Sequence, residues 1–474
     1  MARIVVIGAG IVGLGAAMLL AGDGHQVIVL ERDPEGPPDD PDAAWERWQR
    51  PGLNQFRLPH AFLGGFRDIV DTELPEVAQA LEAAGALRLN LIRDVVPEQT
   101  SGGWRDGDER YEWLTARRPV MEAVTAAAAE SAPGVEVRRG TAVAGLITGP
   151  AALPGVPHVT GVRTRSGEAI PADLVVDMTG RRSGLPDWLD EIGACPVSEE
   201  LEDCGFVYYG RQFRSADGSL PPSLGPPQMH WGTVSSLTLS ADNGTWAVAL
   251  VTGSKDKAMR PLRELDRWEA VVRGLPLIAH WLDGTPIDDG LRVLARLEDR
   301  YRGFVVDGTP VATGVVPVAD SWSCSNPANG RGASIGLLHA RMLRDQLRAV
   351  GLDDPAAFAA AFHQATAESV EPWYRTTLAT DRHRLGEIDA GLSGETYDPP
   401  DPWYQLEKAM GAAAGQDPDC LRAALDIGLV LHGPDEVFAR PGLREKTLRL
   451  GAGWRDEPSL GPDREQLLAL VSAS

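Results

Sequence analysis

The chain has 474 residues, of which 43% are hydrophobic and 24% are charged, as is typical of a soluble globular protein with room for two or three domains. Its 45 Lys and Arg residues and 67 Asp and Glu residues give a formal net charge of −22. This acidic balance argues against binding to nucleic acid or to an anionic membrane surface, because both need positive charge on the protein.

The cysteines and histidines give no sign of a metal site. The four cysteines are scattered without a C-x-x-C pair, and the nine histidines show no metal-ligand spacing. We expect a cytoplasmic protein with reduced cysteines, no disulfide framework and no bound metal. The first predicted strand starts almost at Met1, so no signal peptide is expected, and the apolar stretch 4–20 is too short and too rich in glycine to span a bilayer.

Residues 4–31 predict a strand, a glycine turn, a helix and a second strand. After the apolar run of the first strand, Gly8, Gly10 and Gly13 form a G-x-G-x-x-G pattern. Gly8 allows the tight turn, Gly10 lets the backbone approach a pyrophosphate, and Gly13 lets the helix pack closely on the sheet. The N-terminus of the helix offers free N–H groups and a partial positive charge to phosphates.

The second strand, residues 26–30, ends in Glu31, which lies 18 residues after Gly13. A carboxylate at this place accepts hydrogen bonds from a ribose hydroxyl. Because strand, glycine turn, helix, strand and acid all occur in register, we predict a site for the adenosine half of a dinucleotide and not a chance glycine turn.

The next 150 residues mix helices and short strands. A loop over 34–41 and an arginine-rich stretch over 47–60 precede a predicted helix over 61–87. A second helix is predicted over 113–130, with Arg117 and Arg118 at its start. Short strands are predicted at 135–138, 142–147, 159–165 and 173–177.

The hydrophobic period changes to two between about 204 and 251, which predicts an inserted antiparallel sheet. Its strands are expected at 206–209, 211–214, 235–239 and 245–251. Later elements are a helix over 264–281, strands at 304–306 and 315–318, a helix over 336–350, and a mostly helical remainder with loops at 391–402 and 415–418.

A second informative motif follows the strand at 315–318. That strand ends in Ala319 and Asp320, and Pro327 comes seven residues later, followed by Gly330, Gly332 and a helix start of small residues. An Asp at a strand end can hold a polyol hydroxyl. A glycine-rich turn that opens a helix directs N–H groups at an anion or an electron-poor ring.

These motifs resemble those of the single-component (group A) flavoprotein monooxygenases with the p-hydroxybenzoate hydroxylase fold, whose third motif reads G-D-A-x-H-x-x-x-P-x-x-G-x-G. Four positions match in register: Asp320, Pro327, Gly330 and Gly332. Three depart from it: Ala319 replaces the first Gly, Ser321 the Ala and Ser323 the His. Residues 173–183 resemble the middle motif of the family, residues 118–122 its R-P-x-L-E helix start, and residues 52–60 a stretch of the polyether-pathway flavin epoxidases.

The resemblance covers about residues 1–350 and implies an α/β fold. It predicts a discontinuous FAD-binding Rossmann-like domain of the glutathione reductase type, residues 1–195 plus 296–350. A mainly antiparallel substrate-binding sheet, residues 196–295, is inserted into it. The helical C-terminal region, residues 351–474, matches no motif of the family.

The resemblance implies FAD contacts at twelve positions: Gly8, Gly10, Gly13, Glu31, Arg32, Arg57, Arg118, Val143, Asp320, Pro327, Gly330 and Gly332. The N-terminal glycines hold the pyrophosphate and Glu31 the adenosine ribose. Arg57 and Arg118 lie along the cofactor, Asp320 holds the ribityl chain, and the turn 327–332 faces the pyrimidine edge of the isoalloxazine. A solvated loop arginine at 57, a surface charge at 118 and a helix cap at 320 are the alternatives.

No motif names a catalytic residue. Tyr208, Tyr209, His60 and His230 are candidates for a base only by residue type, and core packing is the alternative for each. The family forms a flavin C4a-hydroperoxide from O2, which implies transfer of one oxygen atom to an apolar small molecule of the natural-product kind, by epoxidation or hydroxylation. Because the chain has one dinucleotide fingerprint, NAD(P)H is expected to visit transiently, or a separate flavin reductase to supply the electrons.

Several other functions stay open. Flavin halogenases share the fold but use an early lysine and a W-x-W-x-I-P motif, whereas the first lysine here is Lys255 and that motif is absent. An alkene reductase of the geranylgeranyl reductase type is distinguished only by assay. The pentapeptide 332–336 matches the G-x-S-x-G of serine hydrolases but lies within the flavin motif. The departures at 319, 321 and 323 also leave open an inactive flavoprotein.

Overall fold

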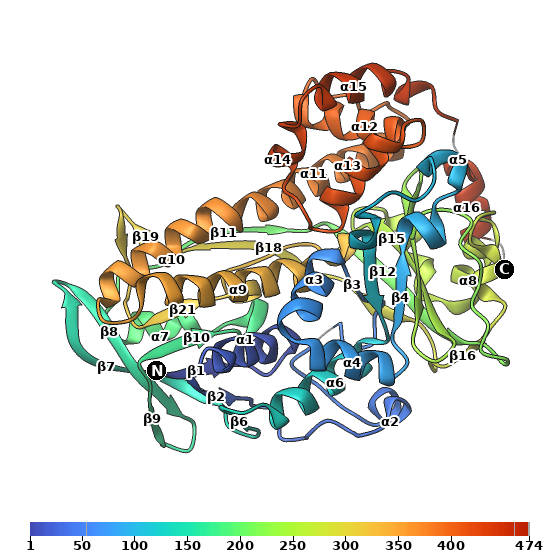
Figure 1. The fold of residues 1–474 in the computed structure, drawn as a ribbon. Coiled ribbons are helices and arrows are strands. Elements are labelled where there is room, and N and C mark those ends of the chain that lie inside the picture. The colour runs from blue at the N-terminus through green and yellow to red at the C-terminus, as the bar shows by residue number, and fades with distance from the viewer. Residues whose placement is uncertain (54, 459, 473–474) are drawn as a thin grey trace.

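The computed structural model describes residues 1–53, 55–458 and 460–472. Its N-terminal part is built on a five-stranded parallel sheet of order β21-β10-β1-β2-β6 (Figure 1). These strands are β1 (Arg3–Ile7), β2 (Gln26–Leu30), β6 (Val135–Arg138), β10 (Leu174–Asp177) and β21 (Val315–Pro317). All except the edge strand β6 are almost continuously apolar, because both faces of the sheet are covered there.

Alternate residues of β1 point into two different cores. Ile4 and Val6 pack against the helices of one face, and Val5 and Ile7 pack against the other. The first face is covered by α1 (Ile11–Gly22), α6 (Arg118–Ser131) and α9 (Gly332–Val350). The second is covered by α7 (Leu185–Glu191) and a small antiparallel sheet of β7 (Val143–Leu153), β8 (Val156–Thr164) and β9 (Ala169–Pro171).

A second large sheet is antiparallel, in the order β13-β14-β15-β12-β16, with β17 also paired to β12. Its strands are β12 (Phe206–Arg214), β13 (Gln228–Trp231), β14 (Val234–Ala241), β15 (Thr245–Gly253), β16 (Thr285–Pro286) and β17 (Arg292–Leu294). Trp268 of α8 (Leu265–Arg273) and Leu467 of α16 (Arg464–Ser472) pack on one face. The other face packs against side chains of the N-terminal part and of the C-terminal helices, as Leu58 and Ile388 do around Tyr208.

Further short elements come before α9 in the sequence. They are α2 (Pro41–Glu46), β3 (Ala61–Phe62), α3 (Gly64–Glu73), α4 (Pro75–Ala83), β4 (Leu87–Asn90), α5 (Glu98–Ser101), β5 (Glu112–Thr115), β11 (Ser198–Asp203), β18 (Glu298–Gly303), β19 (Val305–Val306), β20 (Thr309–Pro310) and β22 (Ser323–Cys324). β3, β4 and β5 form one small sheet, and β11, β18 and β22 form another.

The C-terminal region consists of six further helices before α16. They are α10 (Pro355–Ser369), α11 (Glu371–Ser393), α12 (Pro402–Ala414), α13 (Pro418–Gly428), α14 (Pro434–Phe438) and α15 (Leu443–Leu450). Three of them begin with an Asp-Pro pair, in which Asp354, Asp401 or Asp417 caps the first N–H groups. Helices α12 to α15 form the orange and red group at the top of Figure 1.

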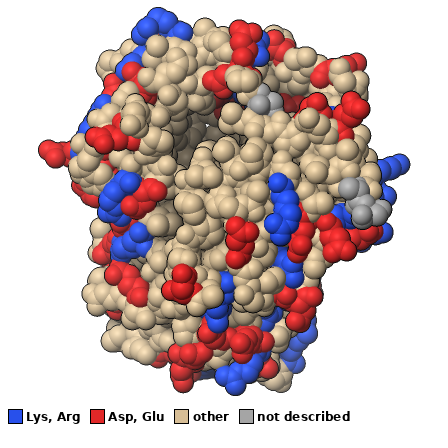
Figure 2. Space-filling model, turned by 90° about the vertical axis from the view of Figure 1, so that its right-hand side faces the viewer, with Lys and Arg blue, Asp and Glu red and all other residues tan. Residues whose placement is uncertain are grey.

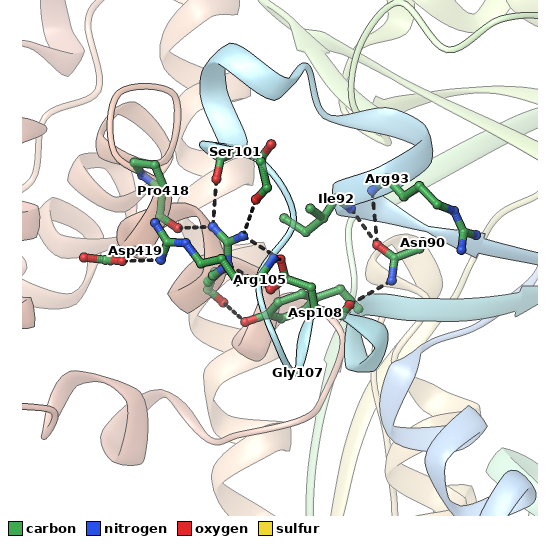
Figure 3. A network of polar contacts seen from close by, with 12 residues as sticks. Asn90, Ile92, Arg93, Ser101, Arg105, Gly107, Asp108, Pro418 and Asp419 are labelled. Atoms are coloured by element: carbon green, nitrogen blue, oxygen red, sulfur yellow. Dashed lines mark hydrogen bonds and ion pairs between the residues drawn. The ribbon is translucent and has the colours of Figure 1, made fainter.

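One arginine anchors this helical group to the rest of the chain. Arg422 of α13 makes five hydrogen bonds, two of them to the carboxylate of Asp108 and the others to the carbonyl oxygens of Ser101, Gly103 and Pro418. Figure 3 shows Asp108 and its neighbours facing the start of α13. A guanidinium with all its N–H donors used fixes both position and orientation.

The predicted fold class is confirmed, and the strands expected at 4–7, 26–30, 135–138 and 173–177 agree with the structure within one residue. The single helix expected over 61–87 is wrong: it is β3, α3 and α4, and the two helices meet at Leu74 and Pro75. Proline has no N–H to donate and disfavours helical backbone in the preceding residue, so the helix cannot continue.

Other expected boundaries are also corrected. The helix expected from 113 begins at Arg118, because Trp113 belongs to β5. The helix expected over 264–281 ends at Arg273, just before Gly274 and Pro276. The strands expected at 206–209 and 211–214 are one strand, and α9 starts at Gly332 and not at 336. Among the described residues, no helix combines the length and the apolar character needed to cross a membrane.

Candidate functional site

The N-terminal glycine turn has the shape of a phosphate cradle. A Cβ on Gly8 (φ +108°) would lie 2.6 Å from the carbonyl oxygen of Met178, and one on Gly13 would lie 2.2 Å from that of Gly8. These two glycines are therefore needed for close packing. A Cβ on Gly10 would meet nothing within 4 Å, and α1 has no side-chain cap. The first turn of α1 thus leaves space and free N–H groups for a phosphate.

Glu31 lies against this turn at the end of β2. Its Oε2 accepts the N–H of Ala9 at 2.9 Å and a guanidinium N–H of Arg50 at 2.8 Å, and its Oε1 accepts the N–H of Asp33 at 3.0 Å. Oε1 therefore keeps one acceptor position, which is what a ribose hydroxyl needs.

Arg50 is a residue of this site that the sequence analysis missed. It is buried, pairs with Glu31 and with Asp33 at 3.0 Å, and donates to the carbonyl oxygen of Ala9 at 3.2 Å. Its Nη1 has no hydrogen-bond partner among the described residues. Its position in the arginine-rich stretch 47–60 was a signal, but nothing local distinguishes it from Arg57.

Asp320 follows β21, at the same edge of the parallel sheet as the glycine turn. The carboxyl ends of β1, β10 and β21 lie side by side there, and the N–H of Gly180 donates to the hydroxyl of Ser321 at 3.0 Å. The Asp320 carboxylate makes no hydrogen bond or ion pair with the described residues. Burial raises its pKa, while the charges of Arg181 and Arg118 oppose that shift. A free carboxylate at this edge fits the hydroxyls of a polyol chain.

Ala319 explains why the family motif has glycine before the Asp. Its φ is +57°, in the left-handed region, where a side chain is unfavourable. Its N–H donates to Nδ1 of His339 at 3.2 Å. Alanine at position 319 therefore keeps the backbone conformation of the motif but lowers the stability of the fold.

The turn over 327–332 presents open backbone. A Cβ on Gly330 (φ +64°) or on Gly332 would meet nothing within 4 Å. Inside the first turn of α9, the hydroxyl of Ser334 is buried without a partner among the described residues. Open glycines and an orphaned polar group fit the edge of a flat, polar ring such as the isoalloxazine, as Asp320 fits its ribityl chain.

The other predicted FAD contacts differ in whether their side chains lie near the site and are free to bind a cofactor. Arg118 starts α6, pairs with Glu122 at 2.6 Å and lies near enough to affect Asp320 electrostatically. Arg57 instead donates to the carbonyl oxygens of Trp45 and Trp48, so its guanidinium is already used by the chain.

Arg32 is exposed and lies against Gly52, and Val143 is buried at the start of β7. Their roles stay predictions. Asn54, within the segment 52–60, lies outside the described residues.

The residue that precedes the second glycine turn connects three parts of the molecule. Asn326 accepts a hydrogen bond from the hydroxyl of Tyr208 on β12 and donates to Oδ1 of Asp381 on α11 at 3.0 Å. Burial raises the pKa of Tyr208 well above its usual value and that of Asp381 to about 8. It raises the pKa of Asp299 on β18 to about 6, with a hydrogen bond from the N–H of Asn326 acting against it.

The remaining candidate bases are not arranged for strong base catalysis. Burial lowers the pKa of His60 and of His230 to about 3, so both are neutral near pH 7. The ring of His60 contacts the carbonyl oxygen of Leu58, and that of His230 the hydroxyl of Ser235. Tyr209 lies in the core on the other face of β12 from Tyr208.

C-terminal helices form part of the wall beside the second turn. Ile388 of α11 packs with Tyr208, and Ala328 of the turn packs against the same cluster. A neighbouring apolar cluster joins side chains of the two predicted domains to the C-terminal helices, among them Ala61, Leu63, Trp113, Leu239, Trp373, Leu421 and Leu429. Figure 2 shows a deep hollow in the upper part of the molecule, where the C-terminal helices lie in Figure 1.

Comparison with known proteins agrees with this geometry. Residues 3–48 match the model of the family described as FAD dependent oxidoreductase (DAO). The chain is 26% identical over 441 residues to "Protein Rv3254" of Mycobacterium tuberculosis, covering 86% of this chain and 85% of that protein.

Two similar solved structures represent two flavin chemistries. PqsL, described as a probable FAD-dependent monooxygenase from Pseudomonas aeruginosa, is 14% identical over 82% of this chain and 98% of its own, with a TM-score of 0.58. CmlS, described as a flavin-dependent halogenase, is 16% identical over 90% and 76%, with a TM-score of 0.59. The chain thus matches an FAD dependent oxidoreductase family over residues 3–48 and has the p-hydroxybenzoate-hydroxylase-like fold.

Proposed function

We propose that this protein is an FAD-dependent monooxygenase that transfers one oxygen atom from O2 to an apolar small molecule, by epoxidation or hydroxylation. The observation that carries the proposal is that the second glycine turn, with Asp320 before it and the buried Ser334 hydroxyl after it, adjoins an apolar wall formed partly by C-terminal helices. This arrangement supports a redox ring that lies beside a region suited to an apolar substrate.

Bound FAD would supply the activation of O2, which no side chain of the chain can perform. The protein's part is to hold the nucleotide at Gly10 and Glu31 and the ribityl chain at Asp320. The wall of the cluster around Leu239 and Trp373 would orient the substrate and exclude water. An oxygen transfer of this kind needs no protein nucleophile, which agrees with the neutral histidines and the hydrogen-bonded Tyr208.

The electrons are proposed to come from NAD(P)H that binds transiently or from a separate flavin reductase. The motif at the N-terminus is the single dinucleotide fingerprint in the sequence, and FAD would occupy it. Likeness in fold does not separate oxygenation from halogenation. The absence of any lysine before Lys255 and of a W-x-W-x-I-P motif favours oxygenation.

The test is product analysis under oxygen-18 with FAD-loaded protein, NADPH or a flavin reductase, and a panel of apolar alkenes and electron-rich aromatics. The proposal expects a product that contains one oxygen-18 atom. Alkene saturation without oxygen uptake would instead establish the reductase, and a brominated product with bromide present would establish the halogenase. Protein that folds but binds no FAD would refute all three.

A further inference from the structure

Arg331 is a half-buried cation, and its two innermost nitrogens have no partner among the described residues. It lies between Gly330 and Gly332, and its Nε and Nη1 are buried and make no hydrogen bond within the described part of the chain. Fully buried arginines of this chain have partners: Arg422 makes five hydrogen bonds, and Arg117 pairs with the buried carboxylate of Asp242 at 2.6 Å. A guanidinium does not lose its proton under these conditions, so burial without an anion is costly.

The surroundings of Arg331 place its side chain toward the C-terminal helices. The carboxyl groups that act on it electrostatically are Glu407 of α12 and Asp381 of α11, and neither forms an ion pair with it in the described part of the chain. The carboxylates of the predicted nucleotide site, Glu31 and Asp320, are not among its electrostatic neighbours. Arg331 therefore belongs to the side of the turn where we propose that the substrate lies.

Both carboxyl groups near Arg331 are poor counter-ions. Glu407 accepts a hydrogen bond from the hydroxyl of Thr380 at 2.9 Å, and Oδ1 of Asp381 accepts from Asn326. Burial raises the pKa of both, which favours their neutral forms. Asp381 is only 4% exposed, and its Oδ2 has no hydrogen-bond partner among the described residues. The Arg331 guanidinium and the unpaired Oδ2 of Asp381 thus lie near one another without forming an ion pair.

We infer that the substrate carries an anionic oxygen, as a carboxylate, phenolate or enolate, and that Arg331 binds this oxygen beside Asp381 while the apolar part of the substrate lies on the neighbouring wall. The inference rests on the proposed function and narrows its substrate class from apolar molecules to apolar acids. Arginine suits this task because its planar group presents parallel N–H donors to a delocalised oxyanion.

The test is calorimetric titration of FAD-loaded protein with 2-naphthoate and with its neutral counterpart, 2-naphthamide. We expect the acid to bind about 10- to 100-fold more tightly than the amide, as hydrogen bonds to a charged group contribute. Arg331→Gln should remove this preference, and Arg331→Lys should restore part of it. The matched control is Arg382→Gln on α11, an exposed arginine paired with Glu202, which should change nothing.

Four results would overturn the inference: equal binding of acid and amide, no binding of either up to about 10 mM, an unchanged preference in Arg331→Gln, or loss of FAD from that variant with no effect on the acid. The last result would assign Arg331 to the cofactor. Because the readout is binding heat, it is separate from turnover. A persistent acid preference without oxygen-18 incorporation would refute the proposed function and leave the anion site standing.

Discussion

Asp381 offers the sharpest test of how the C-terminal helices meet the site. Its carboxyl group is buried, and burial raises its pKa from 3.8 to about 8, against the opposing effect of the hydrogen bond from Asn326. An acid whose pKa is raised on folding stabilises the fold below its unfolded pKa, and that contribution is lost as the pH rises toward the folded pKa. Asp381→Asn keeps the acceptor for Asn326 and removes the ionisation.

The magnitude follows from the two pKa values. Each pH unit between 3.8 and about 8 lowers the free energy of unfolding by about 1.4 kcal/mol, so the step from about pH 5 to about pH 7 removes about 3 kcal/mol in the native chain. Unfolding entropy for 474 residues is roughly 1 kcal/mol per kelvin. The melting temperature of Asp381→Asn relative to the native protein should therefore rise by about 3 °C between these two pH values.

The assay is thermal unfolding of both proteins at the two pH values, with and without FAD. Asp299, Arg331 and Glu407, which also act on Asp381, are present in both proteins, so the difference isolates one carboxyl group. Asp389→Asn on the same helix is the control, because its pair with Lys255 is exposed and contributes at most about 1 kcal/mol. A melting difference that is the same at both pH values would refute the reasoning.

Three further changes test other parts of the structure. Asp320→Ala should weaken FAD binding about 10- to 100-fold without unfolding the chain, as equilibrium dialysis can show; unchanged affinity would remove its proposed role. Ala319→Gly should raise the free energy of unfolding by about 1 kcal/mol in urea titrations, because glycine adopts φ +57° without strain; a loss of stability would contradict this. Arg422→Ala should cost about 3–5 kcal/mol and expose the C-terminal helices to protease, since Asp108 would be left buried and unpaired, whereas Arg105→Ala, which breaks an exposed pair with Asp419, should behave like the native protein.

The sequence predicts most reliably the features that depend on contacts between residues close together in the chain. The glycine turn and β2 could be placed because Gly8, Gly13 and Glu31 interact within one strand–helix–strand unit. Arg50 could not be distinguished from Arg57, since its partners Glu31, Asp33 and Glu122 come together only in the folded chain. The prediction of one helix over 61–87 is wrong for a local reason. Apolar residues continue at helical spacing across Pro75, but a helix cannot continue through this proline.

The C-terminal region could not be connected to the site from its sequence, yet the structure makes it part of the second turn. The side chain of Asn326 uses its oxygen for Tyr208 and its N–H for Asp381, and its backbone N–H faces Asp299. Removal of any one partner leaves a buried polar group unsatisfied next to the turn. A chain ending at residue 350 would therefore contain every flavin motif and still lack Asp381 and Glu407, the two carboxyl groups near Arg331, and the apolar side chains that α11 and α13 contribute.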